Sequence, residues 1–250
     1  MNNKFFKSVY SFTTEEIAGY FPLLELEGKK VFTVGSSSDQ AFNALLLGAK
    51  DITVYDINED TARFGKIKRD IIINCPSRRK MYNKVLKEKD ILLSKDLFSY
   101  ESLTKMNPYM SSSNEYKKLR KLLREEQDKI RYVQGDIMNL EPIKDENYDV
   151  IITSNVLQYL DFFIPKDASP DVALQILFSE LKDHLTDDGI LQLLYYYTFT
   201  NDYLKAKNNY YSTACLPRVV KALNKDMLYL ETFNNSYGTK DAIVTYVKSK

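Results

Sequence analysis

The chain has 250 residues, of which 44% are hydrophobic and 28% charged, so its composition is that of a globular protein and its length suits one large α/β domain. A formal net charge of +1 makes nucleic acid an unlikely partner, and no run of about 18 apolar residues predicts a membrane span. Two distant cysteines and one histidine provide neither a disulfide framework nor a metal site, which favours a reducing, cytoplasmic setting.

The first part of the sequence predicts two strands with a helix between them. Residues 29–34 (KKVFTV) form a short β-branched run that ends at Gly35, and residues 51–56 (DITVYD) form a second one. Between them, residues 36–48 (SSSDQAFNALLLG) begin with serines that can cap a helix and end with a glycine that can terminate it. This order predicts parallel strands joined by right-handed crossovers.

A second helix and a charged block follow these strands. Asn58 can cap the helix, and its apolar residues recur three and four positions apart: Phe64, Ile67 and Ile71. Residues 75–129 then break the alternation of strand and helix. They carry 14 Lys or Arg against 8 Asp or Glu and are mostly helical in pattern. We interpret this block as a helical insertion before the third strand.

The alternation resumes at residues 130–136 (IRYVQGD). Residues 147–155 (NYDVIITSN) form the clearest strand of the sequence and close with Ser154 and Asn155. Ser169 and Pro170 predict the start of a helix, because serine is a good cap and proline suits the first turn. The expected buried face of that helix consists of Val172, Ile176, Leu177 and Leu181.

The last part of the sequence predicts three strands. A turn at residues 187–189 (DDG) leads into residues 190–199 (ILQLLYYYTF). Residues 227–233 and 241–247 are separated by too few residues for a crossover helix, so we expect an antiparallel hairpin. The predicted fold class is therefore α/β: a Rossmann-like doubly wound sheet, mostly parallel, with a C-terminal antiparallel hairpin and a helical insertion between the second helix and the third strand.

In this order of elements the chain resembles the Rossmann-like superfamily of methyltransferases that depend on S-adenosylmethionine (SAM). The resemblance covers residues 29–74 and 130–250. It implies a SAM-dependent transferase domain at 29–250 that contains the insertion at 75–129. Residues 1–28 are then expected to form an N-terminal helical lid over the cofactor.

The acid at the end of the second strand is the main candidate for a cofactor contact. An open α/β sheet binds ligands at the carboxyl ends of its strands, and a carboxylate there can accept hydrogen bonds from both ribose hydroxyls. Asp56 has this place, 21 residues after Gly35, and Ile57 can pack on an adenine. The glycine-rich loop of dinucleotide enzymes serves a pyrophosphate, which SAM lacks. A single glycine thus favours SAM over a nicotinamide cofactor.

The resemblance implies further contacts. Asp136 matches the superfamily's acid near the adenine amino group, with Ile137 beside the ring, and Asn155 lies nearest the sulfonium. In the cofactor-binding loop that begins at Gly35, the candidates for the methionine part of SAM are Ser36, Ser37, Ser38 and Asp39. Each has a structural alternative: Asp56 and the serines can cap helices, Asp136 can form a turn, Asn155 can be an ordinary loop residue, and Asp39 can complement a helix dipole.

The loop also resembles the diacylglycerol 3-amino-3-carboxypropyl transferases of betaine-lipid synthesis. The matching positions include Thr33, Ser36, Ser38, Asp39, Ala41, Leu45, Gly48, Asp56 and Asn58. The resemblance implies transfer of either a methyl or a 3-amino-3-carboxypropyl group to a small-molecule or lipid-like acceptor. The candidate catalytic residues are Asn155 and Tyr159, and a general base can also come from Asp161 or from Tyr195 to Tyr197.

Other functions remain open. The lysines and arginines of residues 113–130 can contact an anionic membrane peripherally or form an ordinary solvated helix face. The chain can instead be a catalytically silent nucleotide-binding or interaction protein on the same fold. His184 is expected at a helix end and outside the site. The oligomeric state is not indicated by the sequence.

Overall fold

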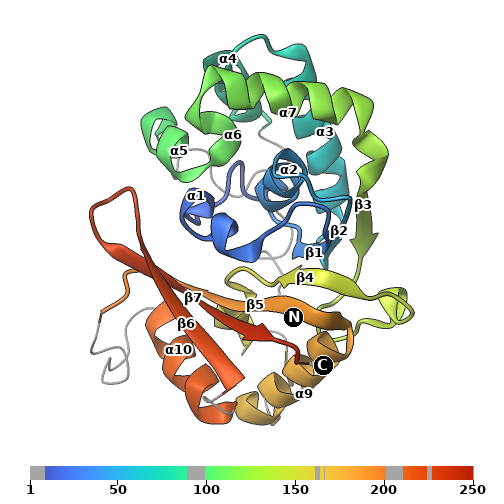
Figure 1. Cartoon of the computed structure of the whole chain (residues 1–250), viewed down its shortest axis with the longest axis vertical. Helices are drawn as coiled ribbons and strands as arrows, with labels where there is room; N and C mark the ends of the chain where they lie inside the picture. Colours follow the sequence, from blue (N-terminus) through green and yellow to red (C-terminus); the bar gives the residue numbers. More distant parts are fainter. Residues whose placement is uncertain are drawn as a thin grey trace. The chain divides into compact units, whose positions relative to one another are not determined.

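The computed structural model describes residues 9–88, 99–160, 164–165, 167–200, 211–223 and 227–249. The chain divides into two compact units, Met1–Ile137 and Met138–Lys250 (Figure 1). The expected sites at 35–57 and 136–137 belong to the first unit, and those at 155 and 159 belong to the second. Asp161 lies outside the described residues.

Three parallel strands form the sheet of the first unit. They are β1 (Lys30–Val34), β2 (Asp51–Asp56) and β3 (Ile130–Gln134). β2 lies in the middle, pairing Val34 with Tyr55 on one side and Asp56 with Gln134 on the other. All three strands therefore end at one edge of the sheet, where the predicted cofactor residues begin.

The helices of the first unit follow the predicted order. They are α1 (Ile17–Tyr20), α2 (Asp39–Leu46), α3 (Asp60–Asn74), α4 (Arg78–Val85), α5 (Tyr100–Met106), α6 (Pro108–Ser111) and α7 (Ser113–Glu125), with short 3-10 turns η2 (Phe21–Leu24) and η3 (Gln127–Lys129). The four helices from α4 to α7 confirm the expected helical insertion before the third strand.

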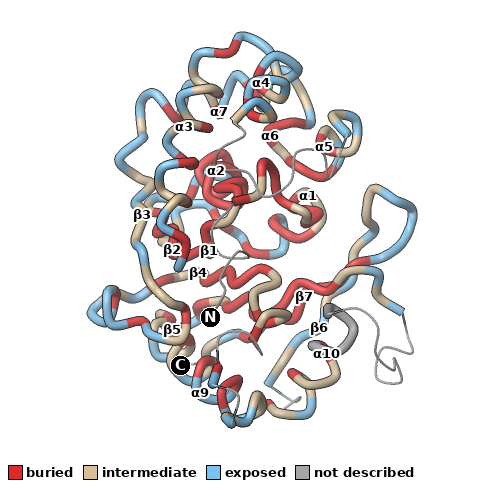
Figure 2. Tube along the Cα trace, turned by 180° about the vertical axis from the view of Figure 1, so that it is seen from behind, coloured by how far each residue is buried: buried red, intermediate tan, exposed pale blue. Residues whose placement is uncertain are grey.

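Helix α2 is buried along its whole length, on its polar as well as its apolar sides (Figure 2). It packs on β1 and β2 and is covered by α6 and α7 of the insertion. The sequence predicts a helix between the first two strands, and the structure adds that none of its faces is exposed. The insertion supplies a second packing surface, and buried Asn43 reaches across to Asn107 with a 2.9 Å hydrogen bond.

The insertion also caps the end of α3. Arg120 and Arg124 of α7 both donate to the carbonyl of Ile73, at 2.9 and 2.8 Å, and the Tyr116 hydroxyl donates to the carbonyl of Ile72 at 3.2 Å. Positive charge near a helix C-terminus is favourable. Part of the basic character of the insertion therefore has a structural role, while Lys117, Lys118 and Lys121 remain exposed.

The second unit holds the remaining strands. Its elements are η4 (Glu141–Ile143), β4 (Tyr148–Ile152), η5 (Val156–Tyr159), α9 (Pro170–Asp183), β5 (Leu185–Tyr196), α10 (Tyr211–Ala222), β6 (Leu228–Asn234) and β7 (Lys240–Val247). β4 and β5 are parallel, and β7 is antiparallel to both β5 and β6. The predicted C-terminal hairpin is thus confirmed, with β6 at the sheet edge.

Two details of the second unit differ from the expectation. The buried face of α9 is made by Ala173, Leu174, Leu177 and Leu181, whereas Val172 and Ile176 are each 51% exposed. The predicted start of the helix is confirmed, because Pro170 begins it and Ser169 caps the amide of Val172. β5 begins at Leu185, so the expected turn at 187–189 lies within the strand as an irregularity, with Asp188 at a φ of 61°.

Counted through both units, the strand order is β3-β2-β1-β4-β5-β7-β6. The predicted fold class is confirmed: a mixed α/β sheet, mostly parallel, with an antiparallel pair at the C-terminal end.

Candidate functional site

The carboxylate of Asp56 is fixed by the backbone on both of its oxygens. The amide of Ser36 donates to Oδ2 and the amide of Asn58 donates to Oδ1, both at 2.8 Å. Burial raises the pKa of Asp56 above its ordinary value, and the two amides oppose that rise. A carboxylate has about four acceptor positions, and these two amides use one on each oxygen.

An apolar surface adjoins this acid. Ile57, the next residue, is 39% exposed although it follows a buried strand. Asp56 itself is partly exposed. An oriented carboxylate beside an exposed apolar side chain has the chemistry that a ribose with an attached base requires.

In the loop between β1 and α2, serines adopt backbone torsion angles that are typical of glycine. Ser36 and Ser38 have φ angles of 47° and 63°, in the left-handed region that favours glycine. Each such residue costs about 1–2 kcal/mol. Gly35 is required for a different reason, since a Cβ there would lie 2.6 Å from Oδ2 of Asp56. The one glycine of the loop therefore stands where a side chain would collide with Thr61 and Asp56.

The structure separates the loop residues that the sequence grouped together. Ser36 is partly exposed, whereas Ser37 and Asp39 are completely buried. The Ser37 hydroxyl donates to Oδ2 of Asp39 at 3.1 Å, and the amide of Thr13 donates to the same oxygen at 2.7 Å. Ser37 and Asp39 therefore form internal contacts of the protein.

The other oxygen of Asp39 meets a buried lysine and a buried tyrosine. The Lys68 ammonium and the Tyr109 hydroxyl each donate to Oδ1 at 2.6 Å. Lys68 also donates to the carbonyls of Ser11 and Ser37, at 2.9 and 3.0 Å. Burial lowers the pKa of Lys68, an effect that Asp39 opposes, and burial together with the Asp39 charge raises the pKa of Tyr109 well above its usual range.

The third strand brings a further acid to the same edge. The amide of Gly135 donates to the carbonyl of Asp56 at 2.9 Å, which places Asp136 just beyond this contact. Asp136 is partly exposed, and Ile137 is buried at 6% exposure. Gly135 is needed because a Cβ there would lie 2.0 Å from the hydroxyl of Tyr55. Gly35, Ser36, Asp56, Ile57 and Asp136 are thus gathered at one edge of the first unit.

The two expected catalytic residues follow β4 in the second unit. Asn155 is partly exposed, and its side-chain amide donates to the Tyr197 hydroxyl at 3.2 Å. Tyr159 ends η5 and is also partly exposed. The turn before them is held by buried Gln192, which accepts from the amide of Ser154 at 2.8 Å and donates to its carbonyl at 3.3 Å.

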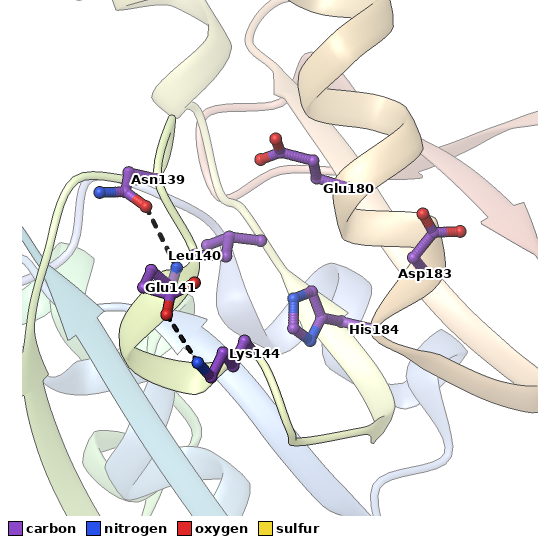
Figure 3. A pocket seen from close by; sticks show the side chains of 7 residues that line it. All are labelled: Asn139, Leu140, Glu141, Lys144, Glu180, Asp183 and His184. Carbon is purple, nitrogen blue, oxygen red and sulfur yellow. Dashed lines mark hydrogen bonds and ion pairs between the residues drawn. The ribbon is translucent and has the colours of Figure 1, made fainter.

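A polar pocket of the second unit lies elsewhere (Figure 3). It is lined by Asn139, Leu140, Glu141, Lys144, Glu180, Asp183 and His184. His184 immediately precedes β5 and hydrogen-bonds through Nδ1 to the carbonyl of Glu146 at 2.7 Å, so it occupies a helix end as expected. The pocket therefore lies at the beginning of β4 and β5, opposite to the carboxyl ends where Asn155 and Tyr197 are found.

Within the described ranges, no group of His, Cys, Asp or Glu is arranged to hold a metal ion. Among the same residues, no helix has the length and apolar character needed to cross a membrane.

Several contributing residues were not predicted from the sequence. They are Thr13, Lys68, Tyr109 and Gln192. The sequence pattern does mark Lys68 as unusual. It lies four residues from both Phe64 and Ile72 on the buried stripe of α3, where an apolar residue is expected. No sequence pattern marks Thr13 or Tyr109, since each contacts Asp39 through the tertiary fold.

Comparisons with known proteins bear on the class of the protein. A family model described as a methyltransferase domain matches residues 103–193, from α5 to β5, and does not include the loop at 35–39 or Asp56. Over this part of the chain, which is less than half of its length, the match supports the expected class of enzyme. A search of curated proteins finds no match.

Solved structures with a similar course of the chain include three methyltransferases. One from Pyrococcus furiosus is 10% identical, with a TM-score of 0.48 and coverage of 92% of this chain and 80% of that one. An rRNA methylase from Streptococcus thermophilus is 10% identical (TM-score 0.42, 90% of each chain). The N-methyltransferase NodS from Bradyrhizobium japonicum, in complex with S-adenosylhomocysteine, is 10% identical (TM-score 0.44, 92% and 86%). None of them identifies the acceptor used by this chain.

Proposed function

We propose that the first unit binds SAM at the carboxyl edge of β1, β2 and β3, with Asp56 as the ribose ligand. The observation that carries this proposal is the orientation of the Asp56 carboxylate by the amides of Ser36 and Asn58, beside exposed Ile57. The residues fit the cofactor: the oriented Asp56 carboxylate can accept hydrogen bonds from ribose hydroxyls, and the neighbouring apolar side chain can cover one face of an adenine.

The roles of the remaining residues follow from their exposure. Ser36 is the partly exposed residue of the serine loop and is proposed to contact the methionine part of SAM. Asp136 is proposed to accept from the adenine amino group, with Ile137 as part of the floor beneath it. Ser37 and Asp39 are proposed to act indirectly, since their polar atoms are used inside the protein.

The transferred group is the finer part of the proposal. Bound SAM supplies a sulfonium with several attached carbons, and the carbon that lies in line with the acceptor is transferred. We propose transfer of a methyl or a 3-amino-3-carboxypropyl group to a small-molecule or lipid-like acceptor. The second group is supported by the resemblance of the serine loop to the aminocarboxypropyl transferases.

Asn155 and Tyr159 are proposed to position the acceptor. The Asn155 side-chain amide donates to Tyr197, which leaves its carbonyl oxygen to accept a proton donor. The phenol of Tyr159 can accept or donate a hydrogen bond at the same end of β4. Peripheral contact of Lys117, Lys118 and Lys121 with anionic lipid also remains a prediction.

Titration calorimetry with SAM, S-adenosylhomocysteine, 5′-methylthioadenosine and NAD tests the proposed cofactor site. We expect binding of the SAM-type ligands, and loss of about 10-fold or more in affinity for Asp56→Ala, which removes charge-assisted hydrogen bonds of about 1.5–3 kcal/mol. Asp51→Ala is the matched control, because Asp51 is an acid of the same strand at its opposite end, where it pairs with Lys30 at 3.9 Å. Equal binding by both variants would sink the ribose assignment.

The products distinguish the two transferred groups. Methyl transfer leaves S-adenosylhomocysteine, and aminocarboxypropyl transfer leaves 5′-methylthioadenosine. Incubation with SAM and extracts fractionated into lipid and water-soluble acceptors, followed by mass spectrometry of the nucleoside product, assigns the group. Binding of SAM without either product across these fractions would favour the silent binding protein instead.

A further inference from the structure

A buried ion pair adjoins the proposed cofactor loop. The side chains of Lys68 and Asp39 are both at 0% exposure. The three donor positions of the Lys68 ammonium are filled by Asp39 and by the carbonyls of Ser11 and Ser37. The Phe12 ring lies 4.4 Å from the same nitrogen. The ammonium is thus completely enclosed and has no position for an external ligand.

These contacts join parts of the chain that are remote in sequence. Lys68 comes from α3, Ser37 from the loop after β1, Asp39 from the start of α2, and Ser11 from the segment that precedes α1. Tyr109 of the insertion adds its hydroxyl to Asp39. The cluster therefore brings the N-terminal segment, the loop and the insertion to one point within the first unit.

The loop needs this support because of its conformation. Ser36 and Ser38 both occupy the left-handed region, which serine rarely adopts. At its beginning the loop is tied to Asp56 through the amide of Ser36. At its end the carbonyl of Ser37 and the carboxylate of Asp39 are tied to Lys68. Backbone strain of this kind persists only where the surroundings enforce it.

We propose that Lys68 is a positioning residue for SAM binding: from inside the protein it holds the serine loop in the conformation that presents the Ser36 amide to Asp56 and leaves Ser36 at the surface. This inference rests on the proposed function. Lys68 does not touch the cofactor and acts through Ser37 and Asp39. Without the ammonium, the loop leaves its left-handed conformation part of the time, and the affinity for SAM falls by the fraction that remains competent.

Lys68→Met tests the proposal, because methionine has a similar length and carries no charge. The matched control is Leu119→Ala, which removes a side chain at 0% exposure from α7 and leaves the loop contacts intact. Both variants destabilise the first unit. Calorimetry with SAM and hydrogen exchange of the amides at 35–39 are measured at a temperature at which both variants are fully folded.

We expect Lys68→Met to bind SAM about 10-fold more weakly and to exchange the loop amides faster, while Leu119→Ala retains wild-type affinity and loop exchange. Tyr109→Phe removes one donor to Asp39 and is expected to shift both readouts in the same direction by about threefold. It decides the question if Lys68→Met does not fold. The proposal would be overturned if Lys68→Met or Tyr109→Phe bound SAM and exchanged its loop amides in the same way as Leu119→Ala.

The two proposals fail in different ways. If the folded wild-type protein binds no SAM, the proposed function is wrong, and the exchange of the loop amides still decides whether Lys68 holds the loop. If the wild type binds SAM and Asp56→Ala does not, but Lys68→Met binds like the wild type, only the role of Lys68 is wrong.

Discussion

The ammonium of Lys68 lies 2.6 Å from Oδ1 of Asp39, and neither side chain is exposed to solvent. Both charges are removed from water, so each depends on the other and on the neutral donors and acceptors around them. Burial lowers the pKa of Lys68, and the charge and the hydrogen bond of the nearby carboxylate oppose this fall.

Removal of one member of this pair is expected to be costly. Lys68→Met leaves a buried carboxylate with only neutral donors, and we expect a loss of about 3–5 kcal/mol in the free energy of unfolding, measured by denaturant titration. The double variant Lys68→Met/Asp39→Asn removes both charges and should recover part of that loss. A loss below about 1 kcal/mol for the single variant would show that the pair contributes little.

Substitution of Ser36 tests the strain in the loop. Ser36→Gly should raise the free energy of unfolding by up to about 1 kcal/mol, because relief of left-handed strain of about 1–2 kcal/mol exceeds the entropic cost of glycine, about 0.5–1 kcal/mol. Ser36→Val, with a β-branched side chain at a φ of 47°, should lower it by more than about 1 kcal/mol. Thermal unfolding of the two variants compares them. The reverse order would contradict a strained loop.

The affinity for SAM should depend on pH through Asp56. A protonated carboxyl loses acceptor capacity, so the dissociation constant should rise as the pH falls toward the raised pKa of Asp56, at a higher pH than the ordinary value of 3.8 implies. Calorimetry over a pH series measures this. Asp56→Asn should bind weakly at every pH, with no such dependence.

The same shift has a consequence for stability, with the opposite sign. A carboxyl whose pKa is raised in the folded state binds its proton more tightly there than in the unfolded chain. The contribution of this carboxyl to the free energy of unfolding is therefore greatest below its pKa in the unfolded chain. It is lost as the pH rises through its pKa in the folded state. In the absence of ligand, the free energy of unfolding of the wild type should rise relative to that of Asp56→Asn as the pH falls into the range in which SAM binding weakens. Parallel changes of stability and affinity would contradict this assignment.

The turn that carries Asn155 depends on Gln192. Gln192→Met removes the side-chain oxygen that accepts from the buried Ser154 amide, while the Ser154 carbonyl keeps its hydrogen bond from the amide of Tyr195 at 2.8 Å, and we expect a loss of about 1–3 kcal/mol in the free energy of unfolding. Gln175→Met, on the exposed surface of α9, is the control and should change it by less than about 0.5 kcal/mol. If the two variants lost similarly little free energy of unfolding, water would be hydrogen-bonding the backbone groups of the turn in place of Gln192.

The strands and their order were predictable because each is a short β-branched run that ends in a turn or a polar residue. The place of Asp56 at the edge followed from the parallel arrangement, and Asp136 was a candidate through the resemblance to SAM-dependent methyltransferases. The division of the loop into accessible Ser36 and buried Asp39 was not predictable. It depends on Thr13 and Tyr109, which approach from segments 26 and 70 residues away in sequence. An acid in a polar loop resembles a ligand contact until its internal partners are known.

The left-handed serines have a consequence for how such proteins are found. A sequence motif defined by glycines assumes that a left-handed backbone conformation requires glycine. Here two serines, Ser36 and Ser38, adopt that conformation instead. The family match begins at residue 103, well after the loop. Searches that describe this turn by its torsion angles and by an acid at the end of the next strand should therefore recover distant members that letter-based searches miss.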